Sequence, residues 1–347
     1  MTEWSTAQTD ARRTLMQWVF GARATEVVSV ATRMDLADTI GDGEADVTEL
    51  ARGYEVPPEQ LNRLLRALAS LGLCTEPRPG IFALTEAGSL LRKGHPASLH
   101  DFAGFHTAPV SLAPWSRLES NIRTGRTAFD EHFGMPIYEY LGNEPELSAV
   151  FNTAMSQETH RTAATLTEHY DFGRFTTVTD IGGGDGTLLA SILKGRPGLS
   201  GVVFDTAEGA GQAAGTIKAA GLEKRCTVAT GNFLESVPAG ADLYMIKSVI
   251  HNWDDDRAAT ILRNCRTAMS AGSRLLIVDV VLPETVIPDS SELNPYLKDL
   301  QMMVLVGGKE RTRADFEKLC TRAGLTLTDI VTLPSHVGLS LIEAVPS

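Results

Sequence analysis

The 347-residue chain has little of what marks secreted, zinc-binding or membrane proteins. Its only four cysteines are far apart, without a Cys-x-x-Cys pair or a histidine at ligand spacing: Cys74, Cys226, Cys265 and Cys320. This spacing argues against a disulfide framework and a zinc cage. No run approaches the roughly 18 apolar residues of a membrane span. The first ten residues lack the basic and apolar regions of a signal peptide. We therefore expect a cytoplasmic protein without a membrane partner.

Positive charge is also scarce. Lys and Arg number 31 against 43 Asp and Glu, which gives a net charge of −12 at pH 7. This balance disfavours nucleic acid and anionic membranes as partners, and leaves small neutral or cationic ligands open. With 43% hydrophobic and 21% charged residues, the composition is that of a folded globular protein long enough for two domains.

The chain divides into two unlike halves. Up to about residue 170 the pattern is helical, and from Phe175 short β-rich runs alternate with amphipathic stretches. The alternation predicts an α/β, Rossmann-like, mostly parallel sheet. Strands are expected near 176–181, 200–205, 226–230, 241–247, 273–279, 325–332 and 337–345. Because a short turn with Pro334 joins the last two, the C-terminal strand should be antiparallel.

The first half contains a winged-helix-like order of elements. A leucine-rich helix follows Pro57-Pro58, a strand is expected at 81–84, and a helix restarts near Thr85. A DNA-binding regulator would need a basic recognition helix, but residues 58–63 are mixed in charge, which favours packing or dimerisation. The segment from Arg12 to Met34 carries an apolar stripe that a partner subunit could bury. We predict a dimerisation domain at 1–100, a helical linker to the substrate pocket at 101–170 and a catalytic domain at 171–347.

A glycine-rich loop is the sharpest local motif. Asp180-Ile181-Gly182-Gly183-Gly184-Asp185-Gly186 follows a β-rich run and opens a helix at Thr187. Glycines let the backbone approach a ligand and adopt turns that a Cβ would obstruct. Thr187 stands where the dinucleotide fingerprint needs glycine, and the lysine–hydroxyl pair of a phosphate-binding loop is missing. The plain alternative is a turn without a ligand.

Two further motifs lie at predicted strand ends. Asp205 ends the run Val202-Val203-Phe204-Asp205, where a carboxylate can accept both hydroxyls of a ribose, or simply cap the next helix. His251 lies just past the expected strand 241–247, on the edge that binds ligands in open α/β folds. An unperturbed imidazole titrates near pH 6.5 and can accept a proton at neutral pH. Asp254 to Asp256 then read as the N-terminal turn of a helix, not as a metal site.

Together these motifs resemble the class I methyltransferase fold, and more narrowly the O-methyltransferases of the plant caffeic-acid type and of bacterial antibiotic tailoring. The resemblance covers nearly the whole chain and includes the helical first half, which matches the family's dimerisation region. Its motifs occur in order: Asp180 to Gly186, Phe204-Asp205, Gly231-Asn232-Phe233, Lys247 to Asp256, Asp279 and Gly307 to Arg311.

The resemblance implies a cofactor, S-adenosylmethionine, with S-adenosylhomocysteine as product and no metal. It implies a cofactor site made of Asp180, Gly182, Gly184, Asp205, Asn232, Phe233 and Lys247. His251 would be the general base, oriented by Asp279 and Glu310. An apolar pocket for a small aromatic substrate would be lined by Phe105, His106, Trp115, Phe151, Met155, Asn252 and Met302. Aromatic and methionine side chains at helical spacing are also typical of plain core.

Two positions depart from the family pattern. Asn232 replaces an acid at the adenine position, and Asn252 replaces an acid that often follows the histidine. The resemblance predicts a homodimeric O-methyltransferase of secondary metabolism that acts on a hydroxyl. The alternatives are a relative that uses the same pocket for hydroxylation, decarboxylation or cyclisation, and a ligand-responsive winged-helix regulator.

Overall fold

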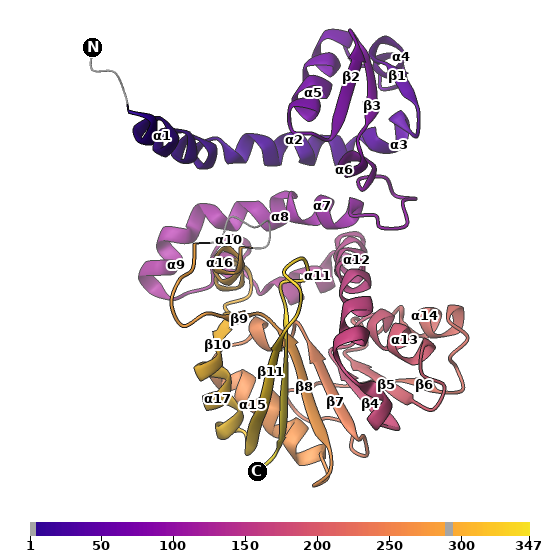
Figure 1. Cartoon of the computed structure of the whole chain (residues 1–347), viewed down its shortest axis with the longest axis vertical. Coiled ribbons are helices and arrows are strands. Elements are labelled where there is room, and N and C mark those ends of the chain that lie inside the picture. The colour runs from indigo at the N-terminus through magenta and orange to yellow at the C-terminus, as the bar shows by residue number, and fades with distance from the viewer. Residues whose placement is uncertain (1–4, 289–293) are drawn as a thin grey trace. The chain divides into compact units, whose positions relative to one another are not determined.

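A computed structural model describes residues 5–288 and 294–347 of the chain (Figure 1). Met1–Trp4, the start of the N-terminal segment considered above, lie outside the described residues. The chain forms two compact units, Met1–Leu112 and Ala113–Ser347. Among the described residues, no helix has the length and apolarity needed to span a bilayer.

The first unit is helical with a small antiparallel sheet in the order β1-β3-β2. Its elements are α1 (Thr6–Val19), α2 (Gly21–Arg33), α3 (Leu36–Ile40), β1 (Glu44–Asp46), α4 (Val47–Gly53), α5 (Pro58–Ser70), β2 (Cys74–Arg78), β3 (Ile81–Leu84), α6 (Glu86–Ser89), α7 (His100–His106) and α8 (Pro109–Leu112). Asp46 caps α4 by accepting hydrogen bonds from the backbone of Thr48 and Glu49. Leu61, Leu65 and Leu68 of α5 are buried in this unit's core, as their helical spacing predicts.

The N-terminal apolar stripe spans two helices. It is not one helix, because α1 ends at Val19 and α2 begins at Gly21, with Phe20 between them. The stripe also has two environments. Ala31 is buried in the unit's own core, while α1 has no buried residue and leaves Leu15 62% and Trp18 64% exposed.

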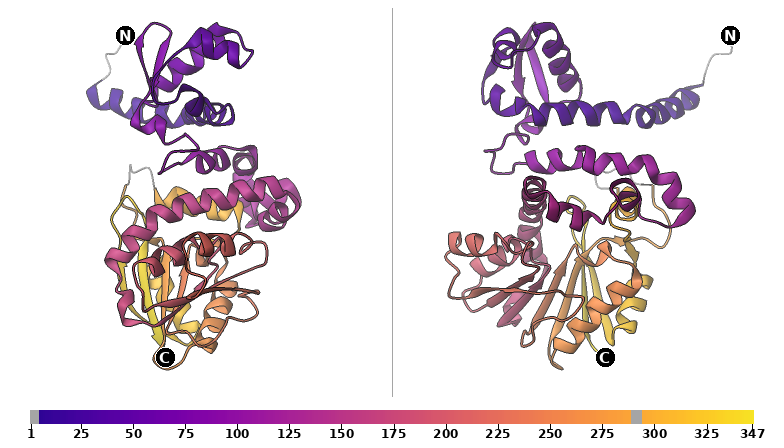
Figure 2. Two further views of the ribbon diagram at one scale, coloured as in Figure 1. Left: turned by 90° about the vertical axis from the view of Figure 1, so that its right-hand side faces the viewer. Right: turned by 180° about the vertical axis from the view of Figure 1, so that it is seen from behind.

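The second unit opens with helices and continues as an α/β sandwich (Figures 1 and 2). The helical part comprises η1 (Ala113–Arg117), α9 (Leu118–Thr124), α10 (Ala128–Phe133), α11 (Ile137–Asn143), α12 (Pro145–His169) and η2 (Phe172–Arg174). The sandwich comprises β4 (Thr177–Ile181), α13 (Thr187–Lys194), β5 (Ser200–Asp205), α14 (Ala213–Ala219), β6 (Cys226–Thr230), β7 (Leu243–Lys247), η3 (Ile250–Asn252), α15 (Asp255–Ala268), β8 (Arg274–Asp279), β9 (Val281–Leu282), α16 (Pro295–Leu305), β10 (Arg311–Thr312), α17 (Arg313–Arg322), β11 (Leu325–Thr332) and β12 (Ser340–Pro346).

The main sheet has the strand order β11-β12-β8-β7-β4-β5-β6. Strands β8, β7, β4, β5 and β6 are parallel, and β12 pairs antiparallel with both β8 and β11. This confirms the predicted mostly parallel sheet with an antiparallel C-terminal strand. The small strands β1, β2, β9 and β10 were not predicted. Strands β1, β9 and β10 have only two or three residues, too few for a periodic pattern, and β2 contains Pro77, which is unfavourable within a strand.

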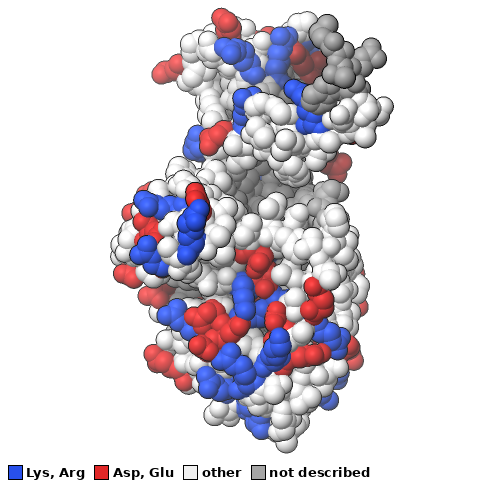
Figure 3. All heavy atoms as spheres, turned by 90° about the vertical axis from the view of Figure 1, so that its left-hand side faces the viewer, with Lys and Arg blue, Asp and Glu red and all other residues white. Residues whose placement is uncertain are grey.

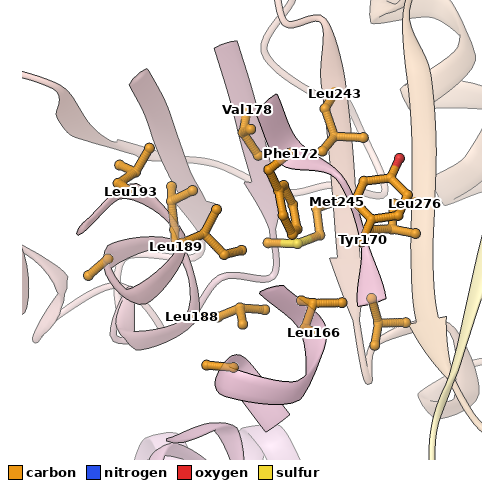
Figure 4. Close-up of a cluster of buried hydrophobic side chains, with 14 of the residues drawn as sticks. Leu166, Tyr170, Phe172, Val178, Leu188, Leu189, Leu193, Leu243, Met245 and Leu276 are labelled. Carbon is orange, nitrogen blue, oxygen red and sulfur yellow. The ribbon is translucent and has the colours of Figure 1, made fainter. Parts of the chain in front are cut away.

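Helices cover both faces of this sheet, and consecutive strand residues alternate between the two cores. Leu243 and Met245 of β7 point into one core, which α12, α13 and α14 complete (Figure 4). Tyr244 and Ile246 point into the other, which α15 and α17 complete. A strand buried on both faces needs apolar residues without a break, and Leu-Tyr-Met-Ile meets that need. The charged surface carries acidic and basic side chains interspersed on the face drawn in Figure 3.

Candidate active site

The carboxyl ends of neighbouring strands carry the polar residues of the candidate site. Asp205 is the last residue of β5, Lys247 of β7 and Asp279 of β8, while β4 ends at Ile181 just before the glycine loop. These strands lie in the order β8, β7, β4, β5. The chain passes from β4 to β5 on one side and reaches β7 on the other, so β4 is a topological switch point, where open α/β sheets bind ligands.

The glycine loop follows β4, and its backbone has a conformation that residues with a side chain rarely adopt. Gly182 has φ +70°, and a Cβ there would lie 2.5 Å from Cγ2 of Val249. Its backbone N–H donates to the carbonyl of Phe204 at 2.8 Å, which anchors the turn to β5. Gly184 also has a positive φ, +55°, and has open space where its Cβ would be. The loop therefore exposes backbone next to the switch point.

Asp180 is a buried carboxylate with an unmet hydrogen-bonding capacity. The residue is 2% exposed, and its Oδ2 atom has no hydrogen-bond partner among the described residues. Burial raises the pKa of Asp180 to about 7, against the opposing positive charge of Lys247. A buried acceptor without a donor is rare in folded proteins and indicates a place for a ligand's donor or positive charge.

Lys247 lies close to this acid. Burial lowers the pKa of Lys247, and the negative charges of Glu158 and Asp180 act in the opposite direction. Its Nζ atom donates to Oγ1 of Thr159 on α12 at 3.3 Å. The resemblance pointed to Lys247, but Thr159 and Glu158 were missed because nothing in their local sequence marks them.

Asp205 is held by the loop that it faces. Its Oδ2 accepts from the backbone N–H of Gly184 at 2.9 Å, and its Oδ1 from that of Thr206 at 2.7 Å. Burial raises the pKa of Asp205, and the two backbone hydrogen bonds act against the rise. A carboxylate offers about four acceptor positions, so two bonds leave capacity for the hydroxyls of a ribose.

Tyr138 is a residue that the sequence did not point to. It is 45% exposed and lies on α11, with its ring 6.4 Å from that of Phe151 on α12. Even so, surrounding protein desolvates its hydroxyl and, with the charge of Asp205, raises its pKa.

His251 contacts two carboxylates through the same ring nitrogen. Its Nδ1 lies 2.8 Å from Oδ1 of Asp279 and 3.1 Å from Oε1 of Glu310. All three side chains are buried. Nε2 has no partner among the described residues. Two acceptors at Nδ1 keep a proton on that nitrogen, so in the neutral ring the free electron pair is on Nε2.

The charge of this cluster favours the imidazolium. Burial lowers the pKa of His251, but the charges of Asp279 and Glu310, with their hydrogen bonds, outweigh it and raise the pKa to about 9. The unperturbed value assumed from the sequence is therefore wrong for the folded protein without ligand. The three side chains offer atoms within 4.8 Å of one another, which is compatible with a metal. We assign the cluster to hydrogen bonding, because Nδ1 already contacts both acids directly.

A buried arginine fixes the turn that carries the histidine. Arg311 is 1% exposed, and its guanidinium donates to the carbonyls of Ile250 and Trp253, on either side of His251, at 3.0 and 2.8 Å. It also donates to Asp255 at 2.9 Å. The backbone N–H of Lys309 also holds this turn, because it donates to the carbonyl of His251 at 2.9 Å.

Gly308 allows this close approach. A Cβ at Gly308 would lie 2.0 Å from the carbonyl oxygen of His251. The glycine pair in the motif from Gly307 to Arg311 is thus a packing requirement of the histidine turn. Ser248, just before that turn, has φ +54°, an uncommon conformation for a residue with a side chain. Asn252 donates to the carbonyl of Ser248 at 3.3 Å, so its amide supports this strained bend.

Asn232 and Phe233, which the resemblance places beside the adenine, have local partners. Asn232 accepts from the backbone of Leu234 at 3.0 Å and donates to Glu235 at 3.2 Å. The Phe233 ring lies edge-on to Trp253 with centroids 6.1 Å apart. Asn232 therefore stabilises the turn after β6, and its role in ligand binding stays a prediction.

The predicted substrate residues fall in both units. Trp115, Phe151, Met155 and Met302 lie in the second unit, on η1, α12 and α16. Met302 is 8% exposed, whereas the other three are half-buried. Phe105 and His106 lie on α7 of the first unit, and Phe105 is 2% exposed. Their contribution to a substrate pocket stays a prediction.

Residues 115–326 match the O-methyltransferase domain, and residues 16–94 match the O-methyltransferase dimerisation domain. O-demethylpuromycin-O-methyltransferase of Streptomyces alboniger is 45% identical over 98% of this chain and 90% of its own length. The phenazine O-methyltransferase PhzM of Lysobacter antibioticus is 39% identical over 96% and 95%.

Solved structures agree with the fold. The crystal structure of LaPhzM has a TM-score of 0.91 at 38% identity, covering 97% of this chain and 99% of that one. NcsB1 from neocarzinostatin biosynthesis, solved with S-adenosylmethionine and 2-hydroxy-5-methyl naphthoic acid, has a TM-score of 0.78 at 32% identity, covering 93% of this chain and 96% of that one.

A relative named for a different reaction is also similar in sequence. Aclacinomycin 10-hydroxylase RdmB of Streptomyces purpurascens is 33% identical over 86% of this chain and 80% of its own length.

The fold and the site define a Rossmann-like, class I methyltransferase. The chain belongs to the O-methyltransferase family, and it is an enzyme that uses S-adenosylmethionine.

Proposed function

We propose that this enzyme methylates a phenolic hydroxyl of a small aromatic secondary metabolite, with His251 as the general base. The observation that carries the proposal is the contact of Nδ1 with both Asp279 and Glu310 at 2.8 and 3.1 Å, which directs the basic nitrogen Nε2 away from the acids. The relatives named for puromycin and phenazine compounds, and the naphthoic acid bound to NcsB1, support an aromatic acceptor.

The residues at the sheet edge fit the cofactor. Gly184 has open space beside β4, and the unpartnered Oδ2 of Asp180 suits the cofactor's cationic methionine end. Asp205 would hold the ribose, and Lys247 would complete the adenosine site. Asn232 and Phe233 would border the adenine. When bound, the cofactor supplies an electrophilic methyl group on a sulfonium.

The protein's part is to move one proton and hold the acceptor. A phenol has a pKa of about 10 and is a weak nucleophile while protonated. Removal of its proton by Nε2 of His251 raises the electron density on the oxygen, a contribution of roughly 10²–10⁴-fold. Asp279 and Glu310 stabilise the imidazolium that forms. A base with a pKa of about 9 nearly matches a phenol, so the proton transfer is only slightly uphill.

The same acids impose a cost at neutral pH, since an imidazolium cannot accept a proton. The positive charge of the bound cofactor acts against protonation of His251 and brings the free base closer to neutral pH. Trp115, Phe151, Met155, Asn252 and Met302 would hold the aromatic ring. We keep the division into a dimerisation region 1–100, a linker 101–170 and a catalytic region 171–347 as part of the proposal.

A homodimer is the second part of the proposal. The match of residues 16–94 to a dimerisation domain and the exposed Leu15 and Trp18 of α1 support it. Light scattering of the full chain at micromolar concentration should give twice the monomer mass. A monomer mass would contradict it.

The test of the base is a matched pair of variants. His251→Ala should lower turnover by about 10²-fold or more while leaving cofactor affinity nearly unchanged. His336→Ala, which removes an exposed histidine, should behave as wild type. Product mass on a panel of phenols should show the gain of one methyl group. Full turnover by His251→Ala at pH 7 would remove His251 as the base.

One other reaction has a specific observation in its favour. RdmB, a relative at 33% identity, is named as a hydroxylase, so a non-methylating reaction in the same pocket is a second candidate. The complete set of His251, Asp279 and Glu310 favours methyl transfer, because hydroxylation does not require this base. Oxygen incorporation without formation of S-adenosylhomocysteine would decide for the alternative.

A further inference from the structure

Lys298 is a charged residue next to the base that the mechanism above does not use. It lies on α16, and its Nζ atom is 3.6 Å from Oε1 of Glu310, the same oxygen that contacts Nδ1 of His251. The Lys298 side chain is 34% exposed, whereas that of Glu310 is 0% exposed. Lys298 is thus partly accessible to solvent, whereas Glu310, the acid that it contacts, is buried.

The two acids at His251 are not equally satisfied. Asp279 Oδ1 accepts from the backbone of Val280 at 3.1 Å, and its Oδ2 accepts from the backbone of His251 at 3.2 Å. Glu310 has no such donors, and its buried Oε2 atom has no hydrogen-bond partner among the described residues. One imidazolium can neutralise only one carboxylate, so Glu310 carries the surplus negative charge of the cluster.

The neighbouring residue of α16 fixes the backbone of the same acid. Asp299 Oδ1 accepts the backbone N–H of Glu310 at 2.8 Å. Lys298 also lies four residues after the helix cap Asn294, at the end of α16 where the helix dipole disfavours a cation. The contact with Glu310, and not the helix dipole, therefore favours a lysine at this position.

We propose that Lys298 is a positioning residue for His251, which balances the charge of Glu310 so that the imidazole can be neutral when it must accept a proton. The inference rests on the proposed function of His251. The charged groups of this region come from several elements: Asp279 and Glu310 contact the imidazole, Lys298 and Asp299 contact Glu310, and Arg311 binds the carbonyl of Ile250. Lys247 interacts electrostatically with Asp279 and Lys298. Of these, Lys298 is the cation that contacts one of the two acids at Nδ1.

Removal of the charge should increase the proton affinity of His251. In Lys298→Met, Glu310 has only the imidazole as a cation, so His251 should titrate about half a pH unit or more above wild type. Lys298→Arg should restore the wild-type midpoint. Lys318→Met is the matched control, because it removes an exposed lysine on α17 that pairs with Asp315.

Two measurements separate this proposal from the function on which it rests. NMR titration of ring-labelled histidine in the full chain without substrate reports the His251 midpoint, assigned by its loss in His251→Gln. The pH dependence of kcat reports the base in the working complex. We expect both to move upward in Lys298→Met. An unmoved NMR midpoint, or a shift that arginine does not restore, would overturn the role of Lys298. A shifted midpoint with an unmoved kcat profile would support Lys298 and refute His251 as the base.

A second pair of variants covers the case in which Lys298→Met fails to fold. Glu310→Gln removes the acid that Lys298 contacts, so adding Lys298→Met to Glu310→Gln should move the midpoint little further. An equal additional shift in the double variant would mean that Lys298 acts independently of Glu310, which contradicts the proposal.

Discussion

Asp279 holds His251 at two points, through Nδ1 at 2.8 Å and through the backbone N–H at 3.2 Å. One carboxylate thus fixes both the ring and the chain that carries it. Glu310 contacts only the ring, at 3.1 Å. The two acids are therefore not equivalent, although both face the same nitrogen.

This difference predicts unequal losses. Asp279→Asn should lower kcat by about 10²-fold, because an amide can present its NH₂ to Nδ1 and favour the wrong tautomer. Glu310→Gln should cost less. The double variant should lose less than the product of the two single losses, since both act through one imidazole. Steady-state kinetics with saturating cofactor measures this, and fully additive losses would argue for separate roles.

The activity should depend on pH in a defined direction. His251 must be neutral to accept a proton. Its acids raise the pKa to about 9 before the cofactor binds, and the cofactor's positive charge opposes that rise, so kcat should increase as the pH rises above 7. Glu310→Gln removes one negative charge, which lowers the pKa of His251 and should move the rising limb to lower pH. A flat wild-type profile from pH 6 to 9 is the result that would exclude His251 titration as the cause.

Asp180 should lower the free energy of unfolding at neutral pH, although it contributes to cofactor binding. It ionises near 3.8 when unfolded and near 7 when folded, so its contribution to folding falls as pH rises from about 4 to about 7. Asp180→Asn removes this loss and should raise the free energy of unfolding at pH 8 by about 1–3 kcal/mol, with little gain near pH 4.

Urea unfolding at the two pH values checks this, with Glu223→Gln as an exposed control. The same variant should bind S-adenosylmethionine more weakly than wild type. A variant that is less stable than wild type at pH 8 would show that Asp180 supports the fold itself.

Asp205 should matter for cofactor affinity and not for the fold. Its carboxylate has two backbone hydrogen bonds and capacity for two more, so Asp205→Ala should weaken S-adenosylmethionine binding at least about tenfold. Calorimetric titration measures the affinity, with Glu223→Ala as the control. Unchanged affinity with an intact fold would remove Asp205 from the cofactor site.

The sequence predicted most of what is local. Apolar runs such as Leu243 to Ile246 identify buried strands, and the glycines after Asp180 identify the turn at the sheet edge. Asp205 and His251 followed from their positions at strand ends.

What the sequence could not predict depends on contacts between distant segments. Arg311 belongs to a sequence motif, but its hydrogen bond to the carbonyl of Ile250, 61 residues earlier, becomes visible only in the folded chain. Lys298 and Tyr138 have no local signature at all. The pKa of His251 could not be predicted either, because it depends on two acids 28 and 59 residues away.

The strand order β8, β7, β4, β5 also fixes the distance between the ends of β8 and β5. Adjacent strands lie about 4.8 Å apart, so the ends of β8 and β5 are separated by roughly 14 Å. Backbone pairing fixes that distance, and side-chain changes in the helices leave it unaltered. Substitutions on α9 to α12 and α16 should therefore leave unaltered the spacing between Asp279, at the end of β8, and Asp205, at the end of β5.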